Sequence, residues 1–148
     1  MIYIAHRGNT KGPNPDKENH PDYIRDALHK GYDAEIDVWF IDGKYILGHD
    51  APQYEVPDYF LQNDRLWCHA KNMAAIIALV DPGFSVHTFF HDTDHCTLTS
   101  QKWIWTFPNT NLVLGPRSVA VMPERAPGWD LSKAGGVCTD FPFKYQMI

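Results

Sequence analysis

The chain has 148 residues, of which 44% are hydrophobic and 14% aromatic, and this predicts one globular domain, residues 1–148, built around a real core. A formal net charge of −5 leaves no broad basic field, which argues against sequence-independent binding of nucleic acid. No apolar run approaches the roughly 20 residues that span a bilayer, and Met1 leads into Ile-Tyr-Ile-Ala-His without a signal-peptide pattern, so we expect a cytoplasmic protein without a membrane span.

Short runs of apolar, β-branched and aromatic residues recur along the whole chain and predict strands. In chain order they are 2–5, 34–40, 45–47, 66–70, 86–90, 96–99, 103–107, 119–122 and 136–139. Two helices fit between them: one begins at Pro21 and stops at Gly31, and the other covers 73–80 behind Asn72 as its N-cap. The dipeptide Asp42-Gly43 predicts a hairpin after the second strand.

The number of predicted strands suggests the fold class. If 45–47 is the return arm of the hairpin, eight strand candidates remain, and eight with a βα start suggest an α/β fold of the (β/α)8 TIM-barrel type. Such barrels typically have about 200 residues or more, so we expect a compact version with most outer helices shortened or missing. Outer strand faces without helices would be apolar and exposed, and a homodimer is one way to bury them.

Two acidic residues mark the second strand. Glu35 and Asp37 share one face because side chains alternate along a strand, and the alternation puts them about 6.5 Å apart along it. In a barrel this face would be the inner one, where two carboxylates repel unless a cation lies between them. Oxygen ligands of this kind suit magnesium, calcium or manganese. A solvated strand edge with acids facing water explains the pattern about equally well.

Two histidines follow predicted strands. His6-Arg7-Gly8 comes directly after the first strand, where His6 could transfer a proton and Arg7 could bind a phosphate through two hydrogen bonds. His49 follows the return arm of the hairpin and should lie at the same rim as Glu35 and Asp37. Two imidazoles beside a metal-bound phosphate can divide the work, one deprotonating the nucleophile and the other protonating the leaving alkoxide.

Taken together, these residues resemble the glycerophosphodiester phosphodiesterase family, which shares a barrel fold with the phosphatidylinositol-specific phospholipases C. The resemblance is strongest over residues 2–50, in Ile4-Ala5-His6-Arg7-Gly8, Glu18-Asn19, Gly31-Tyr32-Asp33-Ala34-Glu35-Ile36-Asp37-Val38, Asp42-Gly43 and His49-Asp50. Further motifs follow in the family's order: Leu66-Trp67-Cys68-His69-Ala70-Lys71-Asn72, Trp105-Thr106 and Val137-Cys138-Thr139-Asp140-Phe141-Pro142.

The resemblance implies a role for each matching position. His6 and His49 would be the acid/base pair. Glu35 and Asp37 would bind the metal ion, Arg7 and Lys71 would contact the phosphate, and Glu18 would support the site. The implied reaction is attack on phosphorus by a neighbouring hydroxyl of a small-molecule phosphodiester, which gives a cyclic phosphate that is then hydrolysed.

The chain departs from the family at one metal position. His69 stands where the family has a third carboxylate, so it is either a ligand or a hydrogen-bond donor to the phosphate. As a ligand it would shift the preference away from calcium toward manganese, zinc or another transition metal. Cys68, Cys96 and Cys138 have no Cys-x-x-Cys spacing, so we expect reduced thiols with structural roles.

Three further residues are candidates for the site. His91 follows a predicted strand and could enter the site, although a hydrated loop with ordinary histidines is the simpler interpretation. Glu124 follows the strand 119–122 in phase with Met122 and could add a carboxylate to the lumen. Trp105 could form the floor of the substrate pocket, although core packing is the usual role of tryptophan.

These patterns leave three functions open. The first is a metal-dependent phosphodiester hydrolase. The second is a phospholipase D-like lyase that would use the same two histidines and metal and would release a cyclic phosphate. The third is a catalytically inactive domain that binds a phosphorylated metabolite: the altered position His69 and the missing helices favour it, while the intact His6 and His49 argue against it.

Overall fold

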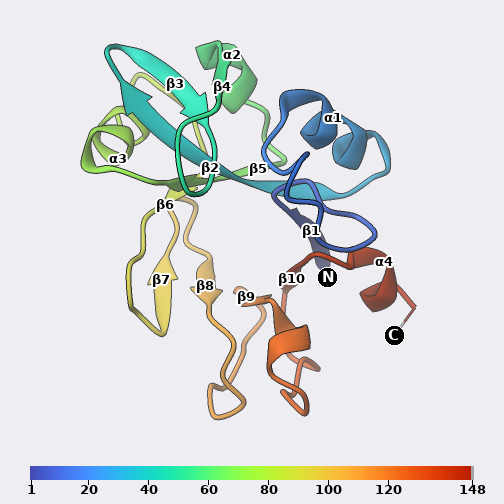
Figure 1. Cartoon of the computed structure of the whole chain (residues 1–148). Coiled ribbons are helices and arrows are strands. Elements are labelled where there is room, and N and C mark those ends of the chain that lie inside the picture. Colours follow the sequence, from blue (N-terminus) through green and yellow to red (C-terminus); the bar gives the residue numbers. More distant parts are fainter. Residues whose placement is uncertain (148) are drawn as a thin grey trace.

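The structure, a computed structural model, describes residues 1–147, which form one mixed sheet of ten strands curled into a half-barrel (Figure 1). The strands are β1 (Ile2–His6), β2 (Asp33–Ile41), β3 (Lys44–Leu47), β4 (Tyr54–Val56), β5 (Leu66–Ala70), β6 (Thr88–Phe89), β7 (Cys96–Leu98), β8 (Ile104–Thr106), β9 (Ser118–Val121) and β10 (Gly136–Thr139). The helices are α1 (Pro21–His29), α2 (Asp58–Leu61), α3 (Met73–Leu79), α4 (Pro142–Tyr145) and the 3-10 turn η1 (Pro123–Arg125). None of these helices is both long and apolar enough to cross a membrane.

The middle of the sheet is parallel. Strands β6, β5, β2, β1, β10, β9 and β8 lie side by side in that order, each parallel to its neighbours. The hairpin β3–β4 extends the sheet beyond the far half of β2, and β7 runs antiparallel to β8. Because β1 lies between β2 and β10, the first and last strands of the chain meet in the centre of the sheet.

The predicted TIM-type (β/α)8 barrel is wrong. Across residues 1–147 the strand ladder stays open, because β6 pairs only with β5 and β7 only with β8. Residues 96–99, counted as a parallel barrel strand, supply the arm β7 of a tight hairpin with β8. The segment 99–103 is too short for the crossover of about a dozen residues that a parallel pair needs. Two hydrogen bonds between Ser100, in the turn of this hairpin, and Thr88 of β6, at 2.8 and 2.9 Å, connect the hairpin to β6.

The outer face of the sheet is covered in two ways. On β2 the side chains of Ala34, Ile36 and Val38 are fully buried beneath α1 and α3, and each larger aliphatic side chain buried in this way contributes about 1.5–3 kcal/mol. On β9, Ala120 instead packs against loop residues, among them Trp129. The chain therefore covers this part of its outer face with loops in place of helices.

The inner face of the curl has its own core. Ile4, Trp67, Phe89, Trp105 and Val119 belong to this inner cluster, which comes from strands on both sides of β1. On β2 the alternating pattern places Glu35 and Asp37 on this inner face, as the sequence predicts, at 3% and 1% exposure. Polar groups so deeply buried must find partners, and these lie at one end of the inner cluster.

His87 makes the stability of the fold depend on pH. The imidazole is buried 4.1 Å from the Trp67 ring, and its Nε2 lies 2.8 Å from Thr99 Oγ1. Burial, helped by the charge of Arg117, lowers the pKa of His87 to about 4. Below pH 6.5 the unfolded chain therefore binds a proton that the folded chain resists until about pH 4, so the free energy of unfolding falls as the pH falls.

We expect His87→Gln to reduce this loss. The wild type should lose up to about 3 kcal/mol more than the variant between pH 6.5 and 4. Urea denaturation at a series of pH values measures the difference, with His95→Gln, an exposed loop position, as the matched control. Parallel curves for wild type and His87→Gln would contradict a neutral buried imidazole.

Candidate active site

A cavity of about 210 Å³ lies where the central parallel strands end. It is lined by His6, Arg7, Glu35, Asp37, His49, His69, His91, Trp105, Phe107, Pro108, Val121, Met122 and Arg125. Most residues that the sequence marks as catalytic, metal-binding or substrate-binding are therefore brought to one place from β1, β2, β5, β8 and the segments that follow β1, β3 and β6. The carboxyl ends of parallel strands are the usual location of such sites.

The buried acids form a cluster with His69. One ligand atom from each of Glu35, Asp37 and His69 lies within 4.8 Å of the others. The register explains this convergence, because Asp37 stands directly opposite His69 in the parallel pair β2–β5. Nδ1 of His69 is 3.2 Å from Asp37 Oδ1 and 3.7 Å from Glu35 Oε1. Two carboxylates and an imidazole form a donor set that suits manganese or zinc as well as magnesium.

The protonation of this cluster follows from its charges. Burial opposes ionisation of Asp37, but its contacts with His69, then the charge of Arg7 and a hydrogen bond from Asn19, outweigh it and lower its pKa. Burial likewise opposes the charged form of His69, but the Asp37 and Glu35 carboxylates outweigh it and raise the pKa of His69 to about 9. The imidazolium thus supplies the positive charge between the acids, and a metal ion bound there would replace its proton.

Asp37 is held by hydrogen bonds through one carboxylate oxygen, whereas the other oxygen makes only ion-pair contacts. Asn19 donates to Asp37 Oδ2 at 2.9 Å and accepts from the Asp37 amide at 2.9 Å. Nε of Arg7 lies 3.3 Å from the same Oδ2. Within residues 1–147, Oδ1 is buried and accepts no hydrogen bond of good geometry; its contacts are the ion pairs with His69 and Lys71. A buried carboxylate oxygen left over in this way, beside two further ligand groups, fits a cation.

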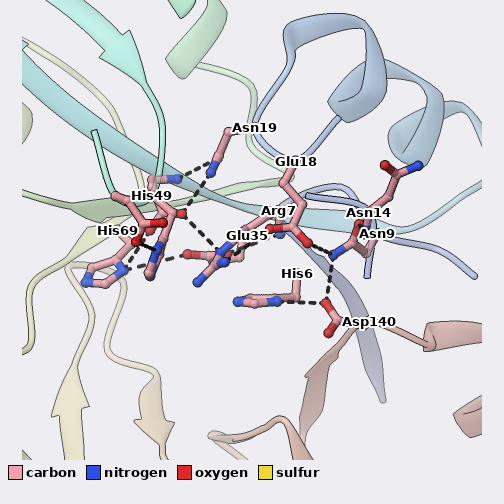
Figure 2. Close-up of polar contacts among 12 residues, drawn as sticks. His6, Arg7, Asn9, Asn14, Glu18, Asn19, Glu35, His49, His69 and Asp140 are labelled. Atoms are coloured by element: carbon pink, nitrogen blue, oxygen red, sulfur yellow. Dashed lines mark hydrogen bonds and ion pairs between the residues drawn. The ribbon is translucent and has the colours of Figure 1, made fainter. Parts of the chain in front are cut away.

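A second network fixes His6 at the end of β1 (Figure 2). His6 Nδ1 lies 2.8 Å from Asp140 Oδ1, so a proton donated from Nδ1 leaves Nε2 as the reactive nitrogen. Asn9, which is fully buried, donates to Asp140 and to Glu18, both at 2.8 Å. Burial would lower the pKa of His6, but the Asp140 hydrogen bond and the Glu35 charge outweigh it and raise that pKa.

His49 is held less firmly. It follows β3, and its Nδ1 lies 2.8 Å from Asp50 Oδ1, which again leaves Nε2 free. Its side chain is 40% exposed, whereas that of His6 is 14% exposed. His49 and Arg7 also line a neighbouring polar cavity of about 170 Å³ between the loops that follow β1 and β3. These two residues therefore stand at the boundary between two cavities.

The remaining candidates lie in or beside the main cavity. The His91 ring stacks on His69 with ring centroids 4.6 Å apart, and its buried Nδ1 finds no hydrogen-bond partner among residues 1–147. Trp105 is nearly fully buried and also lines the cavity, so it combines core packing with a place in the wall. Lys71 lies outside the lining, with Nζ 3.9 Å from Asp37 Oδ1.

The two predicted supporting acids, Glu18 and Glu124, hold other residues of the site in place by hydrogen bonds. Glu18 receives a hydrogen bond from Arg7 Nη1 at 3.1 Å and one from Asn9 at 2.8 Å. Glu124 does not line the cavity: it accepts from the Thr139 hydroxyl at 2.9 Å and so holds the end of β10 beside Asp140.

Several backbone conformations at the site are strained. Arg7, Asn19 and Met122 have φ angles of 53°, 64° and 46°, in the left-handed region that non-glycine residues rarely adopt. Gly8 has φ 87°, and a side chain there would meet Tyr23 at 2.9 Å, so the chain can turn toward α1 only with glycine. Strain of this kind gathers where a surrounding structure fixes side-chain positions.

Several residues of the site were not among the predicted functional residues, and Asp140, Asn9 and Arg125 are the most prominent of them. Asp140 follows the last strand and belongs to the motif 137–142 quoted above, but no role was assigned to it. Asn9 follows the His-Arg-Gly tripeptide closely but carries no pattern of its own. Arg125 belongs to η1, and no feature of the sequence indicates that its side chain reaches the cavity.

Comparison with known proteins adds no family assignment. No family model, no curated protein and no solved structure matches the chain.

Proposed function

We propose that the chain is a metal-dependent phosphodiesterase. One observation carries the proposal: a buried Glu35-Asp37-His69 cluster shares a small cavity with Arg7 and with two histidines that are each oriented by a carboxylate. A divalent cation held by this cluster would polarise the phosphoryl oxygens and offset their negative charge.

The residues around the cluster can carry the remaining chemistry. Arg7 donates from Nη1 to Glu18. Its Nη2 makes none of the hydrogen bonds found in residues 1–147 and can donate to a phosphate oxygen. His6, with its raised pKa, is suited to protonate the leaving alkoxide. His49, open to solvent at the cavity boundary, is suited to deprotonate the attacking hydroxyl or water.

The arrangement of cavities supports a diester substrate rather than a monoester. A phosphate held at Arg7 and His49 would have space on both sides, in the main cavity and in its polar neighbour. Each space could take one of the two alcohol groups of a diester. At about 210 and 170 Å³ both are smaller than the roughly 300–1,000 Å³ of sites for drug-sized ligands, which favours small alcohol groups.

A direct assay tests the proposal. The purified protein is supplied in turn with magnesium, calcium, manganese or zinc, and is offered bis(p-nitrophenyl) phosphate, glycerophosphodiesters and lysophospholipids. We expect metal-dependent cleavage of a diester that a chelator abolishes, with p-nitrophenyl phosphate, a monoester, turned over far more slowly. Phosphorus NMR distinguishes a monoester product from the cyclic phosphate of a lyase. Absence of turnover with every metal and substrate would overturn the proposal and leave a binding domain.

The identity of the third ligand should set the metal preference. His69→Glu replaces an imidazole by an oxygen ligand, so the affinity ratio of manganese to calcium should fall by about tenfold or more. Calorimetric titration of both metals measures this ratio, with His95→Glu as a control that adds the same charge in an exposed loop. An unchanged ratio in His69→Glu would remove His69 from the metal shell.

The two histidine–carboxylate pairs should differ in importance. Asp140 is buried with His6, whereas the Asp50 side chain is 97% exposed, so Asp140→Asn should lower kcat by about 100-fold and Asp50→Asn by less than about tenfold. Loss of the Asp140 charge should also lower the pKa of His6. If His6 is the general acid, the alkaline limb of the pH profile of kcat then moves to lower pH. Equal effects of the two variants, or a profile that does not move, would contradict a positioning role for Asp140.

A further inference from the structure

Arg125 brings a second guanidinium to the main cavity. It lies in η1, directly after β9, whereas the acid cluster comes from β2 and β5. Arg7 is committed to Glu18 and Asp37. The Arg125 side chain is exposed, and within residues 1–147 it forms neither an ion pair within 4.0 Å nor a side-chain hydrogen bond. Its donors are free for a ligand.

The turn that carries Arg125 is held rigidly. Met122 adopts the left-handed conformation, and its amide donates to Cys138 O at 2.7 Å. Pro123 fixes the next φ angle, and Glu124 is anchored on Thr139 at 2.9 Å. The amide of Arg125 closes the turn on Met122 O at 2.9 Å. A fixed backbone with an uncommitted guanidinium is suited to binding, because only the side chain, and not the backbone, loses conformational freedom when a ligand binds.

Part of the cavity lining is apolar. Phe107, Pro108, Val121 and Met122 line the same cavity as Arg125 and offer no side-chain hydrogen-bond donor or acceptor of ordinary strength to an alcohol rich in hydroxyl groups. The small volume leaves room only for a short spacer between the phosphate and Arg125. The cavity therefore fits a ligand with an anion at each end and a short carbon chain between them.

We propose that Arg125 determines specificity by binding an anionic group, a carboxylate or a second phosphate, on one alcohol of the substrate. This inference rests on the proposed phosphodiesterase function and names the substrate class: small phosphodiesters whose alcohol ends in an anion. Guanidinium groups bind both carboxylates and phosphates through paired hydrogen bonds, so the two anions are distinguished by experiment.

Matched substrates test the proposal by turnover. Three phosphodiesters of p-nitrophenol, whose second alcohol is ethanol, 3-hydroxypropanoate or 2-hydroxyethyl phosphate, differ only in the anion at the end of that alcohol. Wild type should prefer one or both anionic diesters over the ethyl diester by about tenfold or more in kcat/KM, mainly through KM, and Arg125→Gln should bring that ratio close to one. Arg25→Gln, at an exposed arginine on α1, is the control and should leave the ratio unchanged.

A binding measurement separates this inference from the proposed function. Calorimetry at saturating metal compares ethylphosphonate with 2-carboxyethylphosphonate and 1,2-ethylenediphosphonate in wild type and Arg125→Gln. If no diester is cleaved, the phosphodiesterase proposal fails. A preference for the two ligands with a second anionic group that is lost in Arg125→Gln still supports the anion site. A wild type without any preference, or a preference that survives in Arg125→Gln, overturns the inference.

Discussion

Asp37→Asn should bind divalent metal at least about 100-fold more weakly than wild type and lose nearly all metal-dependent turnover. The substitution keeps the size of the side chain but removes a ligand charge from the most buried carboxylate of the cluster. Loss of groups that merely support a metal ligand costs about 10- to 100-fold in affinity, and loss of a ligand itself should cost no less. Calorimetric titration with manganese and magnesium measures the affinity.

The variant needs a test that separates metal binding from folding. Asp37 also contacts Asn19 and Arg7, so Asp37→Asn could lower the stability of the metal-free protein. The informative quantity is the rise in Tm that saturating metal produces in each variant, because stabilisation by a ligand depends on its affinity for the folded state. Asp26→Asn makes the same change at an exposed position on α1 and should keep the wild-type rise. An equal rise in Asp37→Asn would remove Asp37 from the metal site.

Local patterns predict much of this molecule. Every predicted strand and both predicted helices have a counterpart in the structure, because alternation, helix caps and the Asp42-Gly43 turn are local features. The short elements β4, α2, η1 and α4 were not predicted. The prediction of a closed barrel was wrong because closure depends on whether each connection forms a hairpin or a crossover, which local patterns do not determine. The segment 99–103 makes a hairpin where the barrel would need a crossover.

The same distinction applies to the site. Glu35 and Asp37 could be predicted as a pair because two residues along a strand return to the same face. Asp140 lies 134 residues from His6, and only the pairing of β1 with β10 brings the two together. The position of Arg125 depends on the left-handed backbone conformation of Met122, which the residue type methionine does not predict. His91, for which a hydrated loop was the simpler interpretation, stacks on His69 in the cavity wall.

His6→Ala and His49→Ala should each lower turnover of a natural diester by about 10² to 10⁴, the usual contribution of an acid/base catalyst. Both should leave metal binding largely intact, because neither residue belongs to the Glu35-Asp37-His69 cluster. Calorimetry on each variant checks this before any kinetic comparison. A loss of metal affinity as large as that of Asp37→Asn would make the histidine a ligand instead of an acid/base group.

The two histidine variants should differ on an activated substrate. A nitrophenyl leaving group needs little protonation, so His6→Ala should recover much of its activity on a nitrophenyl diester if His6 protonates the leaving alkoxide. His49→Ala should not recover, because the attacking hydroxyl or water must still lose its proton. Recovery of His49→Ala in place of His6→Ala would exchange the two roles. Wild-type turnover by both variants on natural and activated substrates would remove the histidines from the mechanism, and the phosphodiesterase proposal would then lack its acid and its base.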